Sequence, residues 1–159
     1  MNDDRTDVRC RDDVERLVRS FYRDAAMDDR LGPIFAAARV DWPSHIDRLT
    51  DFWCWQLLGE SSYTGNPLRA HLPVHGRTPF IEAHFERWLD LFTATVDHHF
   101  RGPTADVAKG RATKMATALR RLLAGRHGHA ATPVQPVRNI TLSHHDGHSG
   151  GYGSSPSRS

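Results

Sequence analysis

The stretch that decides the fold of this chain is His84-Phe85-Glu86-Arg87-Trp88-Leu89-Asp90-Leu91-Phe92. Its apolar residues recur at offsets of three and four, which is the spacing of an amphipathic helix. The full face comprises Ile81, Phe85, Trp88, Phe92, Thr95 and Val96. Thr78-Pro79 predicts the start of this helix, as a capping residue followed by a proline, and Gly102-Pro103 predicts its end.

Two further helices are predicted on the N-terminal side of this stretch. The first follows an N-cap at Asp12 or Asp13. Its apolar face comprises Val14, Leu17, Val18, Phe21, Tyr22 and Ala25. The second opens at Pro43-Ser44, where Ser44 forms a Ser-x-x-Asp start signal with Asp47, and ends at Gly59. Its apolar stripe comprises Ile46, Leu49, Phe52, Trp53 and Leu57.

Shorter elements and a last long helix complete the prediction. A short helix is expected over 35–39, and a turn or two of helix over 67–72, stopped by Pro73. Thr104 is expected to cap the last helix, which Gly125 closes. Its predicted inward residues are Val107, Met115, Ala118, Leu119 and Leu122. The sequence contains no repeat and no convincing strand, so the predicted fold class is all-α.

Length and composition indicate one compact domain with polar ends. The chain has 159 residues, of which 38% are hydrophobic, and these are concentrated between residues 13 and 125. We therefore predict a flexible arm over 1–12, a domain over 13–125, and a disordered Gly, Ser and His-rich tail over 126–159. A net charge of +2 gives no strong attraction to nucleic acid or to a membrane.

The sequence predicts a cytoplasmic protein. It shows no signal-peptide pattern, and no apolar stretch approaches the roughly 18 residues that span a bilayer. Cys10 and Cys54 are expected to be free thiols in a reducing compartment.

His71 is a candidate metal ligand that two prolines bracket. A haem iron held by one imidazole needs a neutral ring in a fixed orientation, usually set by a carbonyl or carboxylate on the other ring nitrogen. A short, stiff segment between Pro67 and Pro73 is suited to that task. The alternative is an ordinary surface or half-buried histidine, since the chain has 11 of them.

The aromatic residues indicate either a core or the lining of a pocket. They are numerous for one small domain: Phe21, Tyr22, Phe35, Phe52, Trp53, Trp55, Phe85, Trp88 and Phe92. Aromatic stripes at helical spacing usually form core. Tyr22, His45 and Trp88, however, place hydrogen-bond donors from three helices on these faces, and buried donors need partners. A porphyrin, a flat apolar plate, needs such a lining.

The order and spacing of several blocks resemble a truncated haemoglobin of the third group. The blocks are Phe21-Tyr22, Leu31-Gly32-Pro33-Ile34-Phe35, His45, Tyr63-x-Gly65-x-Pro67-Leu68, Pro67-Leu68-Arg69-Ala70-His71-Leu72, and His84 to Phe92. The resemblance covers about residues 13–125. It implies a two-over-two helical sandwich that encloses haem b, iron protoporphyrin IX.

The resemblance also implies roles for individual residues. His71 matches the proximal histidine that binds the iron. Tyr22 and Trp88 match distal donors to the bound ligand, and His45 matches a distal donor or gate. Phe35 matches the phenylalanine that wedges against the haem. The implied cofactor-binding residues are Phe35, Arg48, Leu49, Phe52, Leu68, Arg69, His71 and Phe92. Arg48 and Arg69 are candidates for the haem propionates, or else ordinary solvated arginines.

The implied function is reversible binding of dioxygen or another diatomic ligand at a polar distal site. Nitric oxide, carbon monoxide and cyanide are the other expected ligands, and a monomer or weak oligomer is expected. Nitric oxide dioxygenase or peroxidase-like chemistry would need an external reductant, such as an unidentified reductase, because the chain has no flavin or nicotinamide motif. The sequence leaves open whether the protein is an enzyme.

Two other classes of protein remain open. A cofactor-free helical interaction domain would bury Tyr22, His45 and Trp88 as hydrogen-bonded core. A metal-handling protein would work through its tail, where His127-Gly128-His129 and His144-His145-Asp146-Gly147-His148 are typical of metal-scavenging tracts.

Overall fold

The computed structural model describes residues 3–124, which form six helices and no strand. The helices are α1 (Arg11–Met27), α2 (Gly32–Ala38), α3 (Trp42–Leu58), α4 (Pro67–Arg77), α5 (Glu82–His99) and α6 (Pro103–Ala124). The all-α prediction is confirmed for this part of the chain. The tail predicted over 126–159 lies outside the described residues.

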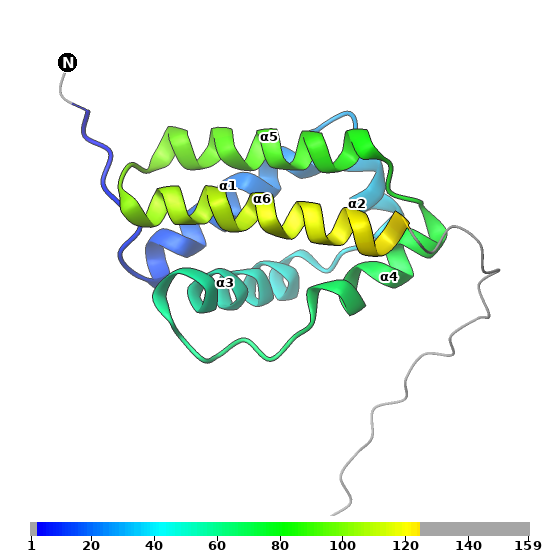
Figure 1. Cartoon of the computed structure of the whole chain (residues 1–159), viewed down its shortest axis with the longest axis horizontal. Helices are drawn as coiled ribbons and strands as arrows, with labels where there is room; N and C mark the ends of the chain where they lie inside the picture. The colour runs from blue at the N-terminus through cyan, green and yellow to red at the C-terminus, as the bar shows by residue number, and fades with distance from the viewer. Residues whose placement is uncertain (1–2, 125–159) are drawn as a thin grey trace, which may run out of the picture.

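Two pairs of helices form the body of the molecule. α1 packs on α3, α5 packs on α6, and the pairs meet where α1 contacts α5 and α3 contacts α6. Figure 1 shows α5 and α6 side by side, with α1 behind them and α4 at one end, where it contacts α6 and α2. This is the predicted two-over-two sandwich. Within the described range, no helix is long and apolar enough to cross a membrane.

Large rings fill the contact between the two pairs. Phe21 of α1 meets Trp88 and Phe92 of α5 edge-on, with centroid separations of 5.5 and 5.3 Å. Trp53 of α3 is 1% exposed and stacks on Phe92 at 4.7 Å. Burying one such side chain stabilises the fold by about 1.5–3 kcal/mol. The apolar face predicted around Trp88 and Phe92 is therefore the face that joins the two layers.

α6 faces the sandwich with small side chains. Its buried residues are Ala105, Ala108, Ala112, Ala116, Leu119 and Leu123. The prediction of an inward Leu119 is confirmed, but Val107, Ala118 and Leu122 are exposed, so their predicted inward orientation is wrong. Each residue turns the helix by about 100°, so residues one or two places from the alanine stripe point away from it.

Three predicted helix starts are wrong. α3 begins at Trp42, so Ser44 lies within its first turn. α5 begins at Glu82, and Thr78 instead ends α4. α6 begins at Pro103, one residue before its predicted cap. Proline fits the first turn of a helix, so the signals at Pro43 and Pro103 do not separate neighbouring start positions, whereas Pro79 lies outside α5, three residues before Glu82.

α4 also extends further than predicted, because it continues through Pro73. An internal proline removes one N–H, the one that would reach the carbonyl of Arg69. Both ends of α4 are nevertheless closed. The Arg69 N–H donates to Oδ1 of Asn66 at 3.1 Å, and the Thr78 N–H donates to the carbonyl of Val74 at 2.8 Å.

The N-terminal segment is held against the start of α6. Val8, within the arm predicted to be flexible over 1–12, is 2% exposed. The carboxylate of Asp7 accepts the N–H groups of Thr104 at 2.9 Å and Ala105 at 2.8 Å. Asp7 therefore caps a helix almost a hundred positions away, and the described part of the arm packs on the domain.

Asp7→Ala is expected to lower the free energy of unfolding by about 1 kcal/mol at pH 7. Burial raises the pKa of Asp7, but the N–H groups of Thr104, Ala105 and Val8 outweigh this effect and hold the pKa below its usual value. The carboxylate thus stabilises the fold above about pH 4, and the stabilisation is lost as pH falls through the lowered pKa. Urea unfolding at pH 7 and in acid measures both effects.

The matched control is Asp4→Ala, which removes an exposed carboxylate from the same segment. We expect it to leave the unfolding midpoint at pH 7 nearly unchanged. Equal losses in the two variants would contradict capping by Asp7.

Candidate functional site

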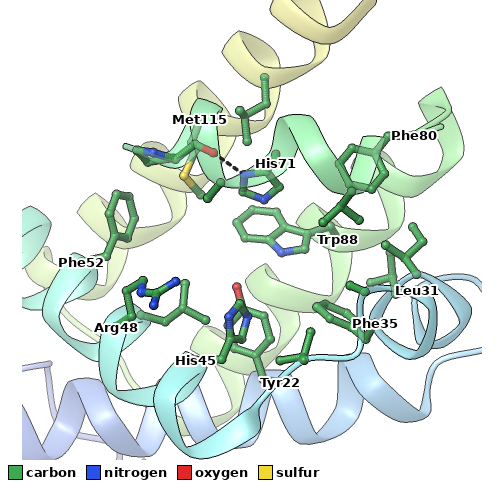
Figure 2. Close-up of a pocket in the computed structure, with 18 of the residues that line it drawn as sticks. Tyr22, Leu31, Phe35, His45, Arg48, Phe52, His71, Phe80, Trp88 and Met115 are labelled. Atoms are coloured by element: carbon green, nitrogen blue, oxygen red, sulfur yellow. Dashed lines mark hydrogen bonds between the residues drawn. The ribbon is translucent and has the colours of Figure 1, made fainter. Parts of the chain in front are cut away.

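A cavity of about 430 Å³ lies among the six helices. This volume is in the range of small-molecule pockets, about 300–1,000 Å³. Its wall is mostly apolar and includes Tyr22, Leu31, Phe35, His45, Phe52, His71, Phe85, Trp88 and Met115. Figure 2 shows His71 on one side of this space and Tyr22 and His45 on the other, with Trp88 between them in this view.

His71 on α4 points its ring into the cavity (Figure 2). Its Nδ1 lies 2.6 Å from the carbonyl oxygen of Pro67. Because a carbonyl only accepts hydrogen bonds, Nδ1 carries the proton and Nε2 keeps its lone pair. Burial lowers the pKa of His71, and the Pro67 carbonyl only partly offsets this. The ring is therefore neutral at pH 7 and presents Nε2 as a ligand atom.

Tyr22 and Trp88 both line the cavity that His71 faces. Burial raises the pKa of Tyr22 far above its usual value, and a hydrogen bond with Trp88 opposes that rise. Since indole N–H is only a donor, Trp88 takes no proton from the phenol. The hydroxyl of Tyr22 stays protonated and keeps its own hydrogen for another acceptor.

His45 on α3 completes the polar side of the cavity. Its ring meets the Tyr22 ring edge-on at 5.3 Å. Burial lowers the pKa of His45, and the positive charge of Arg48 lowers it further. Its Nε2 is buried without a hydrogen-bond partner. Buried polar atoms are rarely left unpaired, and in a cavity wall such an atom indicates a ligand that would pair with it.

An ion pair holds the α2 wall of the cavity in place. Oδ2 of Asp28 lies 2.6 Å from Nη2 of Arg87 on α5, and the Asp28 side chain is only 8% exposed. Oδ1 of Asp28 accepts the N–H of Leu31 at 3.1 Å. One buried carboxylate therefore ties the start of α2, and with it Leu31 and Phe35, to the helix that carries Trp88.

The structure brings together most of the residues that the sequence predicts for the site. Those that line the cavity are Tyr22, Phe35, His45, Arg48, Leu49, Phe52, His71 and Trp88. Leu68, Arg69 and Phe92 do not line it. Arg69 is exposed and lies two residues from His71, which places it on the opposite side of α4.

Phe92 supports the site from behind rather than lining it. It is 1% exposed, and its ring lies between those of Trp88 at 5.3 Å and Trp53 at 4.7 Å, nearly parallel to both. Phe92 therefore fixes the plane of the Trp88 ring. Helical spacing correctly places Phe92 on the same face of α5 as Trp88. Spacing alone does not show whether a residue on that face lines the cavity or is buried one turn away from it.

Sequence reasoning did not assign Tyr63, Phe80 and Met115 to the site, although all three line the cavity. Phe80 lies between two helices, where periodicity carries no information, and its ring approaches His71 at 6.1 Å. Met115 is on the predicted inward face of α6, and apolar residues on such a face are expected to form core. The sequence pattern that could have assigned Tyr63 to the site is the Tyr-x-Gly-x-Pro-Leu block.

The residues fit a haem group. His71 offers one correctly oriented imidazole, the walls are largely apolar, and an unpaired nitrogen of His45 lies on the far side. These are the requirements of a haem bound through one axial histidine with a ligand site opposite. Arg48 stands in the same wall and would suit a propionate.

Comparisons with known proteins agree with this geometry. Residues 8–121 match the family model for bacterial-like globins. The chain is 32% identical over 120 residues to the group 3 truncated haemoglobin of Campylobacter jejuni, covering 73% of this chain and 92% of that protein. It also resembles the crystal structure of the group III truncated haemoglobin from Campylobacter jejuni, with a TM-score of 0.68 and 31% identity, covering 79% of this chain and 99% of the other.

Proposed function

Because the chain belongs to the bacterial-like globins and is a group III truncated haemoglobin, we propose that it holds haem b through His71 and binds dioxygen or another diatomic ligand reversibly. Haem, when bound, supplies the iron to which such ligands attach. The observation that carries this proposal is the 2.6 Å contact between Nδ1 of His71 and the Pro67 carbonyl. It leaves Nε2 of His71 free to bind iron inside the cavity.

The distal residues would select and retain the ligand. Trp88 takes no proton from the hydroxyl of Tyr22, which leaves the Tyr22 proton available to a ligand in the cavity. Negative charge that develops on dioxygen is stabilised by donors already in position, at little reorganisation cost. The unpaired Nε2 of His45 offers a second polar contact. A site of this kind favours slow ligand release.

The same donors suit two reactions. Oxygen-dependent oxidation of nitric oxide and reduction of hydrogen peroxide both benefit from a hydrogen-bonded ligand. Both also need electrons from outside, such as from a reductase. We therefore propose ligand binding as the primary function and either reaction as a secondary one, with nitric oxide, carbon monoxide and cyanide as further ligands.

A cofactor-free interaction domain is the competing proposal. It would have no use for a buried, unpaired nitrogen at His45 beside a cavity of about 430 Å³. An intense absorption band near 400 nm in the purified protein, or its appearance on adding hemin, would distinguish the two.

His71→Ala is expected to abolish stable haem binding, because the only proposed iron ligand is removed. The measurement is transfer of haem to an excess of apomyoglobin, followed by absorption. Adding free imidazole should partly restore the haem band, since imidazole can occupy the vacated space. The matched control is His98→Ala, an exposed histidine of α5, which should retain haem like the parent. Normal haem retention in His71→Ala would refute the assignment.

Tyr22→Phe is expected to speed dioxygen release about tenfold, because one hydrogen bond of about 1–1.5 kcal/mol to the ligand is lost. Stopped-flow displacement of dioxygen by carbon monoxide measures the rate. Carbon monoxide accepts hydrogen bonds weakly, so its own release should change much less. If the dioxygen off-rate were unchanged, Tyr22 would not contact the ligand.

A further inference from the structure

Two rings connect the cavity wall to the protein surface. Tyr63, in the segment between α3 and α4, lines the cavity. Its ring stacks on Trp55 of α3, with a centroid distance of 5.7 Å and an interplanar angle of 23°. Trp55 is 46% exposed, which is unusual for so large a ring. The stacked pair therefore has one face on the cavity and the other in solvent.

Gly65 keeps the space that the Tyr63 ring occupies. A Cβ atom at position 65 would lie 2.6 Å from Oη and 2.7 Å from Cζ of Tyr63. Any other residue at this position would displace the ring from Trp55. The stack thus depends on a local feature of the segment and is more than an incidental contact of two surface side chains.

A second series of rings reaches the same pair from the distal side. Trp88 stacks on Phe92 at 5.3 Å, and Phe92 stacks on Trp53 at 4.7 Å. Trp53 meets Phe52 at 5.3 Å, and Phe52 in turn meets Tyr63 at 5.2 Å. Figure 2 shows Phe52 and Trp88 on different walls of the cavity. Both walls are therefore linked through ring contacts to the exposed stack.

We propose that the Trp55–Tyr63 stack is an electron port, at which small phenolic reductants at the surface deliver single electrons to an oxidised haem in the cavity. The inference rests on the haem binding of the proposed function and identifies a second substrate site outside the ligand pocket. Tryptophan and tyrosine are the two aromatic side chains that readily lose one electron, whereas phenylalanine does not. Close ring contacts shorten each transfer, and an exposed indole offers a face on which a phenol can stack.

The chemistry balances with hydrogen peroxide as oxidant. Haem, when bound, would supply the two electrons with which hydrogen peroxide and two protons become two waters. Trp55 would return these electrons one at a time, and each time it would lose its indole proton to water. The neutral indole radical then takes a hydrogen atom from a phenol. Two phenols thus become phenoxyl radicals for each peroxide consumed.

The surroundings favour Trp55 over Tyr63 as the final carrier. Burial raises the pKa of Tyr63, and the nearby Arg48 only partly offsets this. A phenol must give up its proton when it is oxidised, and Tyr63 has less access to water than Trp55. Trp55 can pass its proton directly to solvent.

The test compares the parent protein with Trp55→Phe and Trp55→Tyr, all loaded with hemin. Each is treated with hydrogen peroxide and a nitroso spin trap, digested, and analysed by mass spectrometry. In the parent we expect the trap on Trp55. Trp55→Phe keeps an aromatic ring in the stack but cannot be oxidised, so trapping in residues 49–69 should fall to background and phenol oxidation should slow at least fivefold. Trp55→Tyr should restore both signals.

The control is Trp42→Phe, which changes a tryptophan outside the ring series. Its ring contacts Tyr22 and His45 at 6.4 and 5.8 Å, and we expect unchanged trapping at Trp55. Parent protein that takes up hemin and reacts with peroxide but traps no radical on Trp55 overturns this inference alone. A Trp55→Phe variant that oxidises phenols at the parental rate also overturns this inference. A parent that takes up no hemin overturns the proposed function and this inference with it.

Discussion

The hydrogen bond from Nδ1 of His71 to the Pro67 carbonyl is the contact on which the candidate site depends. At 2.6 Å it selects the tautomer of the ring, fixes its direction, and leaves Nε2 facing the cavity. Donor and acceptor lie one helical turn apart on α4, so the orientation of His71 is set within the helix that carries it. α4 lies at one end of the molecule, against α6 and α2 (Figure 1), and its His71 faces the cavity of about 430 Å³, which can take a flat cofactor beneath the ring.

The packing of the two helix pairs positions the wall of the cavity that lies opposite His71. Phe92 and Trp53 are buried core residues, yet their stack fixes the ring of Trp88, which lines the cavity together with Tyr22. Core and site are therefore continuous on α5. From the sequence, the aromatic face of α5 could be either structural core or pocket lining. Both are correct, because Phe92 is core and Trp88 lines the cavity.

Sequence reasoning identified the residues that meet in the site, but not the boundaries of their helices. Tyr22, His45, His71 and Trp88 all reach the cavity, because helical spacing and block order restrict which faces can meet. The start predicted at Pro43-Ser44 is one residue late, since a proline fits several positions of a first turn, and the start predicted at Thr78 is wrong because Pro79 lies outside α5. The stop at Pro73 failed as well, because losing one N–H did not outweigh the closed ends of α4.

The sequence by itself determined the all-α class and the apolar faces of α1 and α3, because these follow from spacing along the chain, and its resemblance to the truncated haemoglobins supplied the candidate ligands. Only the tertiary structure decided which predicted residues line the cavity and which support it. It separated Phe92 from Trp88 and excluded Arg69. It also gave α6 its cap, since the carboxylate of Asp7 comes from the far end of the chain. Such contacts join residues distant in sequence, and no local pattern encodes them.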